Sequence, residues 1–456
     1  MTHVTVIGGG LAGVEAAWQI AKRGVPVHLF EMRPRRRTPI HQTDQLAELV
    51  CSNSLRSDRL DTAHGLLKEE MRRLGSLIME AATEARVPAG SALAVDRNVF
   101  AAHVSAALAS FSNLTLRREE VPSIPEEGLV VVASGPLTSD SLTESITRFT
   151  GKDSLYFYDA VSPVVEAESI DMSKAFRASR YGKGGDDYIN CPMDETEYRR
   201  FYEGLRSAPS MELHDIDDAR FFEGCLPIEV MAQRGYETLR FGPMRPVGLV
   251  DPRTGKRPFA AVQLRQDDLA ASLYNMVGFQ NQLKWGEQKK LLRLIPGLEH
   301  AEFSRFGMIH RNTYINAPAV LESTFQTRSR ADLFFAGQIS GVEGYTESAA
   351  SGLLAGINAA RCARDLSALV PPRTTALGAL AFYISHSSPD NYQPTNIAFG
   401  LLPPLPTHVR DKRARKQATV RRALEDIDAF LTLAGAESSA SRATLPASRA
   451  AGAANA

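Results

Sequence analysis

The first 31 residues constrain the fold of this chain more than any other segment. Residues 4–31 read VTVIGGGLAGVEAAWQIAKRGVPVHLFE, in which a four-residue apolar strand precedes the pattern Gly8-x-Gly10-x-x-Gly13. A helix follows, Gly24 ends it, and a second apolar strand finishes at Glu31. This order of strand, glycine turn, helix and strand is typical of dinucleotide-binding βαβ units, so the fold class is expected to be α/β with a Rossmann-type parallel sheet.

The residues of the turn each have a physical task in such a unit. Gly8 permits the tight turn, Gly10 lets the backbone approach a pyrophosphate, and Gly13 lets the helix pack closely on the strand. The helix N-terminus faces the phosphates, and the carboxylate of Glu31 can bond ribose hydroxyls. The predicted cofactor-binding residues of this segment are Gly8, Gly9, Gly10, Leu11, Ala12, Gly13 and Glu31.

Two later segments favour FAD as the dinucleotide. GLVVVASGP, residues 128–136, has the form of an apolar strand that returns to a nucleotide domain. ADLFFAGQISGVEGYTESAASGLLAGINAAR, residues 331–361, predicts a buried strand, a glycine turn and a small-residue helix. Gly337 and Gln338 in that turn are predicted to reach the ribityl-phosphate, although many flavoproteins carry an acid where this chain has Gln338. Residues 151–300 contain no second glycine fingerprint for a separate NAD(P)H domain.

These segments predict a discontinuous architecture. Residues 1–150 and 301–435 form an FAD-binding domain of the glutathione-reductase-like kind, and residues 151–300 form an inserted α/β domain. Residues 407–431 predict an amphipathic helix with Val420, Leu424, Ile427 and Leu431 on one face. The tail from 436 to 456 is rich in Ala and Ser and is expected to be disordered.

The balance of charged residues limits where the chain could bind a polyanion such as a nucleic acid. Lys and Arg number 52, as do Asp and Glu, so a polyanion site must be a local patch. Candidate patches are the basic first half of the helix at 407–431 and RPRRR at 33–37, each of which can also be a solvated surface. The glycine loop GKGGDD, residues 182–187, can hold an anion through backbone N–H groups or be a solvated turn. No apolar run reaches about 18 residues, so no membrane span is expected.

The chain has four cysteines, Cys51, Cys191, Cys225 and Cys362, and no CxxC pair. This scarcity predicts no metal site and a reducing compartment, and with the strand that starts at residue 4 it makes the cytoplasm the expected location. Cys51 lies in the polar segment AELVCSNSLRSD, where Arg56 and Arg59 can lower the pKa of its thiol. Cys191 and Cys362 are expected to be small buried hydrophobes.

Several long blocks of the sequence together resemble the TrmFO family, the folate-dependent tRNA (uracil-5-)-methyltransferases related to the larger MnmG (GidA) flavoproteins. The resemblance covers about residues 1–430. The blocks, besides the opening fingerprint, are AELVCSNSLRSD, RYGKGGDDYINCP, FFEGCLPIEVMAQRG, TLRFGPMRPVGL, MIHRNTYINAP and LFFAGQISGVEGYTESAASGLLAG.

The resemblance implies a specific reaction. The family transfers a one-carbon unit from 5,10-methylenetetrahydrofolate to C5 of the T-loop uridine (position 54) of tRNA, giving 5-methyluridine. It uses FAD, with NADPH or NADH as reductant. The two functional cysteines of the family fall on Cys51 and Cys225 of this chain.

The chemistry explains why cysteine is needed. A thiolate that adds to uracil C6 makes C5 nucleophilic, and a second group must then remove the C5 proton. We favour Cys225 as the attacking thiolate and Cys51 as the assisting group. Three alternatives remain open: a flavin-dependent small-molecule oxidoreductase with the two cysteines as a redox pair, a non-catalytic tRNA-binding flavoprotein, and the same methylation on ribosomal RNA. The sequence leaves the oligomeric state open.

Overall fold

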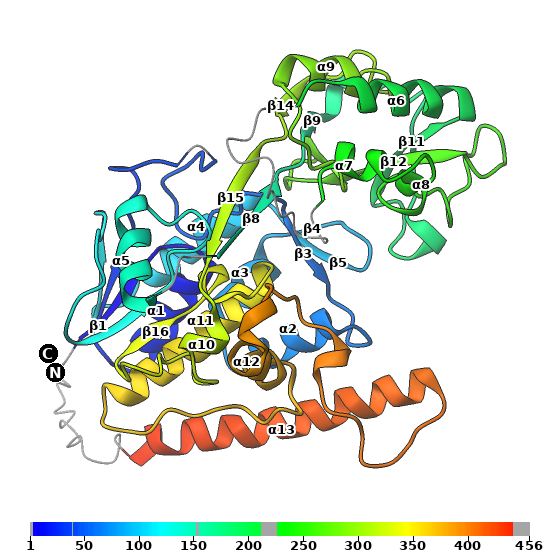
Figure 1. The fold of residues 1–456 in the computed structure, drawn as a ribbon. Coiled ribbons are helices and arrows are strands. Elements are labelled where there is room, and N and C mark those ends of the chain that lie inside the picture. The colour runs from blue at the N-terminus through cyan, green and yellow to red at the C-terminus, as the bar shows by residue number, and fades with distance from the viewer. Residues whose placement is uncertain (1–2, 39, 152–154, 211–225, 441–456) are drawn as a thin grey trace, which may run out of the picture.

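The computed structural model describes residues 3–38, 40–151, 155–210 and 226–440. Its first lobe is built on a five-stranded sheet in the order β16-β7-β1-β2-β6, in which every neighbouring pair is parallel (Figure 1). The strands are β1 (Val4–Ile7), β2 (Val27–Phe30), β6 (Leu114–Arg117), β7 (Leu129–Val132) and β16 (Leu333–Phe335). The predicted parallel α/β sheet is therefore confirmed, and strand β16 from the second half of the chain lies beside β7 from the first half.

Two helices with small residues cover this sheet in direct contact with each other. Helix α1 (Leu11–Lys22) follows the glycine turn, and helix α11 (Tyr345–Cys362) follows β16. A Cβ atom on Gly352 would lie 2.1 Å from the carbonyl oxygen of Ala12, and one on Gly356 would lie 2.6 Å from that of Ala16. Glycines one turn apart on α11 therefore let the two helix backbones touch, and this contact positions the N-termini of both helices at one edge of the sheet.

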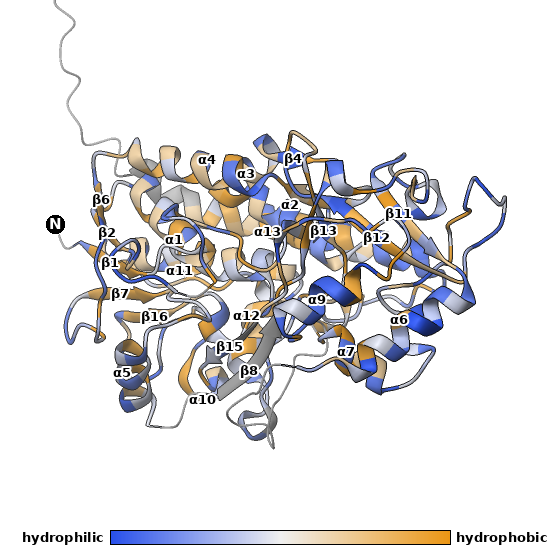
Figure 2. Cartoon of the chain, turned by 90° about the horizontal axis from the view of Figure 1, so that it is seen from above, coloured by the Kyte–Doolittle hydropathy of each residue, from blue (hydrophilic) through white to orange (hydrophobic). Residues whose placement is uncertain are grey.

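The remaining elements of the first lobe pack around these layers. The helices are α2 (Ala63–Arg73), α3 (Leu77–Glu84), α4 (Arg97–Ala109), α5 (Asp140–Thr150), α10 (Ala317–Val320), α12 (Ala376–His386) and α13 (Lys412–Ala440). A small antiparallel sheet contains β3 (Ser54–Ser57), β5 (Ala92–Val95) and β4 (Arg86–Val87). Figure 2 shows apolar residues concentrated along the strands and inner helices of this lobe.

Helix α13 confirms the predicted amphipathic pattern near the C-terminus. Val420 and Ile427 are buried in the core, and Leu424 and Leu431 pack against it. The guanidinium of Arg73 on α2 donates to the carbonyl oxygen of Leu424 at 3.1 Å. The helix runs to Ala440 and so includes the first five residues of the expected tail, 436–440. Residues 441–456 lie outside the described residues.

The inserted region forms a second lobe with its own core. Its six-stranded sheet is antiparallel throughout, in the order β10 (Phe176–Arg177), β11 (Tyr188–Met193), β12 (Ala260–Gln266), β13 (Leu273–Met276), β9 (Val164–Glu166) and β14 (Phe303–Arg305). Its helices are α6 (Glu195–Ser207), α7 (Ile228–Gln233), α8 (Thr238–Phe241) and α9 (Trp285–Leu292). Strands β8 (Leu155–Ala160) and β15 (Ile309–Tyr314) pair antiparallel as a ribbon between the lobes (Figure 1).

Candidate active site

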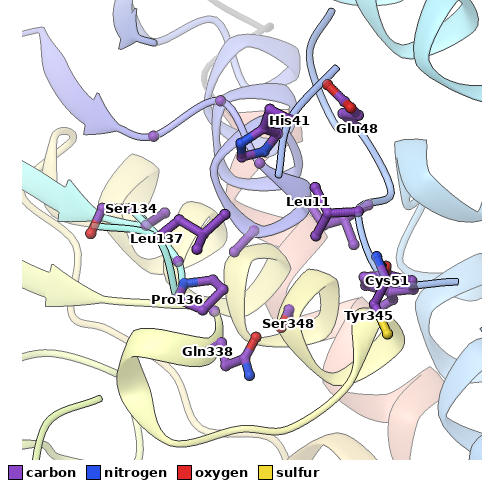
Figure 3. Close-up of a pocket in the computed structure, with 18 of the residues that line it drawn as sticks. Leu11, His41, Glu48, Cys51, Ser134, Pro136, Leu137, Gln338, Tyr345 and Ser348 are labelled. Atoms are coloured by element: carbon purple, nitrogen blue, oxygen red, sulfur yellow. The ribbon is translucent and has the colours of Figure 1, made fainter. Parts of the chain in front are cut away.

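A cavity of about 520 Å³ opens at the carboxyl ends of β1, β7 and β16. Its lining includes eight of the predicted cofactor residues, Gly8, Gly9, Gly10, Leu11, Ala12, Glu31, Gly337 and Gln338. Cys51 lies on the same wall as Tyr345, and Pro136 and Leu137 lie across from them (Figure 3). Arg265, Asn275 and Gly278 are among the lining residues that come from the inserted lobe, so the cavity is formed by both lobes.

The three glycines of the opening turn have different structural roles. Gly8 has φ +111°, and a Cβ atom there would lie 2.4 Å from the carbonyl oxygen of Ala133. A Cβ atom on Gly13 would lie 1.8 Å from the carbonyl oxygen of Gly8. Around Gly10, by contrast, no atom lies within 4 Å of an added Cβ. Glycine is thus needed at positions 8 and 13 because the chain's own backbone leaves no room for a side chain there. At Gly10 the missing side chain leaves open space that a pyrophosphate can occupy.

Two helix N-termini meet at this cavity. Helix α1 begins after Gly10 and helix α11 begins after Gly344, and neither of these N-cap glycines supplies a side chain to bond the first N–H groups. The first residues of both helices line the cavity. Uncapped N–H groups and the positive ends of two helix dipoles make a favourable site for an anionic group such as a pyrophosphate.

Glu31 is fixed at the end of β2 by two sets of bonds. Its Oε2 accepts from the N–H of Gly9 at 3.0 Å, and its Oε1 accepts from the Nε of Arg33 at 2.9 Å. Burial would raise the pKa of Glu31, but the hydrogen bonds from Arg33 and Gly9 outweigh it and hold the pKa below its usual range. The ionised carboxylate keeps lone pairs that ribose hydroxyls can bond.

The loop of Cys51 is held by residues that are distant in the sequence. The N–H of Cys51 donates to the Oη of Tyr345 at 2.7 Å. Arg97 donates to the carbonyl oxygen of Leu49 at 2.9 Å, and Arg305 donates to that of Val50. These bonds fix the loop from α4, β14 and α11 and keep the thiol on the cavity wall.

The cations next to Cys51 differ in part from those expected. Arg265 and Arg305 are near enough to interact electrostatically with its thiol. Arg265 is buried and lines the cavity, whereas Arg305 is half-buried. Arg59 instead forms a surface ion pair with Asp61 at 2.6 Å, and Arg56 lines the cavity. Arg265 and Arg305 lie more than 200 positions from Cys51, so no local pattern in the sequence could have indicated them.

Comparisons with known proteins agree with this geometry. The family model described as "Glucose inhibited division protein A" matches residues 3–367. A methylenetetrahydrofolate–tRNA-(uracil-5-)-methyltransferase TrmFO of Symbiobacterium thermophilum is 61% identical over 432 residues, which are 94% of this chain and 97% of that protein. The TrmFO of Enterococcus faecalis is 56% identical over 422 residues, 92% of this chain and 97% of that protein.

The chain belongs to the TrmFO family. The crystal structure of GidA from Aquifex aeolicus superposes with a TM-score of 0.69 at 18% identity, covering 96% of this chain and 75% of that one. At that identity the likeness concerns the fold, and it supports the FAD-binding Rossmann-type fold of this chain. The TrmFO family uses FAD, a folate donor and NAD(P)H.

The other cysteines of this chain divide into two groups. Cys191 is fully buried on β11, and this burial raises the pKa of its thiol to about 12. Cys362 is half-buried at the end of α11, where burial also raises its pKa. Neither lines the cavity, which agrees with their predicted structural role. Cys225 lies outside the described residues, so its predicted role stays a prediction.

The two basic segments of the sequence have different environments. In RPRRR, Arg33 is buried between Glu31 and Glu48, and Arg36 pairs with Glu120 at 2.6 Å. The sequence predicts RPRRR to be either a polyanion patch or a solvated loop, and in both of these residues the positive charge is paired with a carboxylate, although the Arg36 side chain stays partly exposed. On and just before α13, the exposed basic residues are Arg410, Lys412, Arg413, Arg415 and Arg421.

Neither membrane nor metal features are found where the structure is described. Within residues 3–440, apart from the gaps given above, no helix is long and apolar enough to cross a membrane. In those residues no three His, Cys, Asp or Glu side chains are grouped so as to hold a metal ion.

Proposed function

We propose that this chain methylates C5 of the T-loop uridine (position 54) of tRNA, with 5,10-methylenetetrahydrofolate as one-carbon donor and NADPH or NADH as reductant. The observation that supports this most is the position of Cys51. Its thiol lies on the wall of the cavity that the dinucleotide glycine turn opens into. A nucleophilic residue next to a flavin site is the arrangement that this chemistry requires.

The residues around the cavity fit FAD. The open space at Gly10, the two uncapped helix N-termini and the carboxylate of Glu31 match a pyrophosphate and a ribose. Gly337 adds room because a Cβ atom there would lie 2.9 Å from the Cβ of Ala12. When bound, FAD supplies the redox and one-carbon chemistry, and the protein supplies its position.

The chain's own groups carry the steps on uracil. A cysteine thiolate adds to C6 of a uracil flipped out of its loop, and this addition makes C5 nucleophilic. The other cysteine assists when the C5 proton leaves. Arg265 and Arg305 place positive charge near Cys51. We assign the attack to Cys225 and the assisting role to Cys51.

The test of the activity combines the holoprotein with unmodified tRNA transcript, methylenetetrahydrofolate and NADPH. Nucleoside mass spectrometry should detect 5-methyluridine, and a transcript with cytidine in place of uridine 54 should give none. Product from ribosomal RNA but not from tRNA, or flavin turnover with a small molecule alone, would contradict the proposal.

The cysteine roles need a separate test. The variant Cys51→Ala should retain FAD and lose methyl transfer, whereas the control Cys362→Ala, outside the cavity, should keep both. A tRNA with 5-fluorouridine at position 54 traps the C6 adduct because fluorine cannot leave as a proton. Under our assignment Cys51→Ala still forms the adduct and Cys225→Ala does not. The opposite pattern would exchange the two roles.

A further inference from the structure

An exposed aromatic residue in a strained backbone conformation marks one surface of the inserted lobe. Tyr181 belongs to the glycine loop RYGKGG, residues 180–185, and has φ +61°. Its side chain is 58% exposed. The left-handed conformation is unfavourable for a residue with a side chain, and burial of the ring does not offset the strain here. Strain of this kind persists mainly at functional positions.

The surrounding chain holds the Tyr181 ring in place. The N–H of Tyr181 donates to the carbonyl oxygen of Gly248 at 2.9 Å. A Cβ atom on Gly248 would lie 3.1 Å from three ring carbons of Tyr181, so the ring rests directly on a glycine backbone. One face of the ring is therefore supported by protein, and much of the side chain faces solvent.

Three basic residues, Arg180, Lys183 and Arg245, belong to this surface, and the loop that holds Tyr181 continues into Asp186 and Asp187. The guanidinium of Arg180 donates to the carbonyl oxygen of Arg245 at 2.6 Å, and the Nζ of Lys183 lies 5.7 Å from the Tyr181 ring centroid. Burial and the positive charge of Arg245 both lower the pKa of Arg180. Among the described residues, no carboxylate lies within 4.0 Å of the charged groups of Arg180, Lys183 or Arg245. An anionic partner would relieve this repulsion.

The elements that carry this surface also contact elements that line the cavity. Tyr188, which follows the glycine loop, pairs in register with Arg265, and Arg265 lines the cavity. Gly278 also lines the cavity, and a Cβ atom there would lie 2.7 Å from the Cβ of Pro243, which precedes Arg245 by two residues. A large substrate whose reacting base enters the cavity therefore has this surface within reach.

We propose that Tyr181, together with Arg180, Lys183 and Arg245, forms a platform on which an unpaired base of the substrate tRNA stacks while its flanking phosphates bind the cations. This Tyr181 platform rests on the proposed function, because it presupposes a tRNA substrate. An aromatic face next to Arg and Lys is the combination that binds single-stranded nucleotides, and the free positive charge is complementary to phosphate.

The decisive variant is Tyr181→Gly, because glycine accepts the left-handed backbone and removes only the ring. We expect the melting temperature of the holoprotein to stay equal or rise, and the Kd for a fluorescent tRNA transcript to increase roughly tenfold or more, as for the loss of one stacked base. Tyr181→Phe should keep the affinity. Trp285→Ala removes a comparably exposed aromatic from α9, 57% exposed, and should leave the Kd unchanged.

The charges are tested by salt dependence. The double variant Lys183→Gln/Arg245→Gln should reduce the slope of log K against log salt by about 0.7 for each lost phosphate contact. If the Tyr181→Gly variant binds tRNA with the wild-type Kd, the platform is overturned. If that variant also shows a raised KM for NADPH, the surface is instead a site for a small molecule. If the wild type neither binds nor methylates tRNA, the proposed function fails and the platform fails with it.

Discussion

The substitution Gly10→Val separates cofactor binding from folding at this site. Gly10 has φ −78° and ψ −175°, an extended conformation that valine adopts without strain. An added Cβ has no neighbour within 4 Å, so the protein itself tolerates the side chain. The valine methyl groups would occupy the open space beside Gly10, where we expect the pyrophosphate to bind. We therefore expect a folded protein that has lost most of its affinity for FAD.

The size of the effect follows from the overlap. Forcing extra carbon atoms into a filled site costs about 1–3 kcal/mol. Since about 1.4 kcal/mol is a tenfold change, the Kd for FAD should rise roughly 5- to 150-fold. At an FAD concentration of about 100 times the wild-type Kd, binding stabilises the wild type by about 2.7 kcal/mol. A variant with a Kd raised about 100-fold gains only about 0.4 kcal/mol under the same conditions.

The assay measures FAD content by absorbance and the melting temperature with and without added FAD. The control Gly286→Val makes the same change on exposed helix α9, where an added Cβ also meets nothing within 4 Å, and should keep normal FAD content. Gly13→Val should fail to fold, since its Cβ would lie 1.8 Å from a carbonyl oxygen. A normal FAD content in Gly10→Val would refute the reasoning. An FAD-free Gly10→Val protein that lacks the circular dichroism signal of a folded chain would also refute it.

Three further predictions concern charge and burial. Replacing three exposed basic residues of α13, Arg413, Arg415 and Arg421, together by glutamine should weaken tRNA binding and flatten its salt dependence in filter-binding assays. An unchanged slope would place the RNA surface elsewhere. Cys191 should resist iodoacetamide at pH 8 in the native protein and react after denaturation. Peptide mass spectrometry measures the extent of labelling, and labelling of the native protein would contradict the burial of this thiol. Folding lowers the pKa of Glu31 from its ordinary value of 4.5. The ionised carboxylate should therefore stabilise the fold fully at pH values above 4.5, and this stabilisation should disappear as the pH falls through the lower pKa of the folded state. The free energies of unfolding of wild type and Glu31→Gln should therefore converge in acid, and a constant difference down to pH 2 would count against this.

The sequence by itself determined the features that depend on short separations along the chain. The glycine turn, helix α1 and strand β2 form one unit, and the bond from Gly9 to Glu31 spans 22 residues. The amphipathic face of α13 follows from apolar spacings of three and four. Local geometry dictates such features, so a pattern of residue types is enough to predict them.

Only the tertiary structure decided what surrounds the thiol of Cys51 and which arginines are paired with carboxylates. Tyr345 lies 294 positions from Cys51 and Arg305 lies 255 positions from Val50, yet both fix the Cys51 loop. Arg33 looks like part of a basic loop in the sequence, but it is buried between two carboxylates. Contacts of this kind depend on how separate lobes and helices pack, and packing brings together residues whose positions along the chain carry no information about one another.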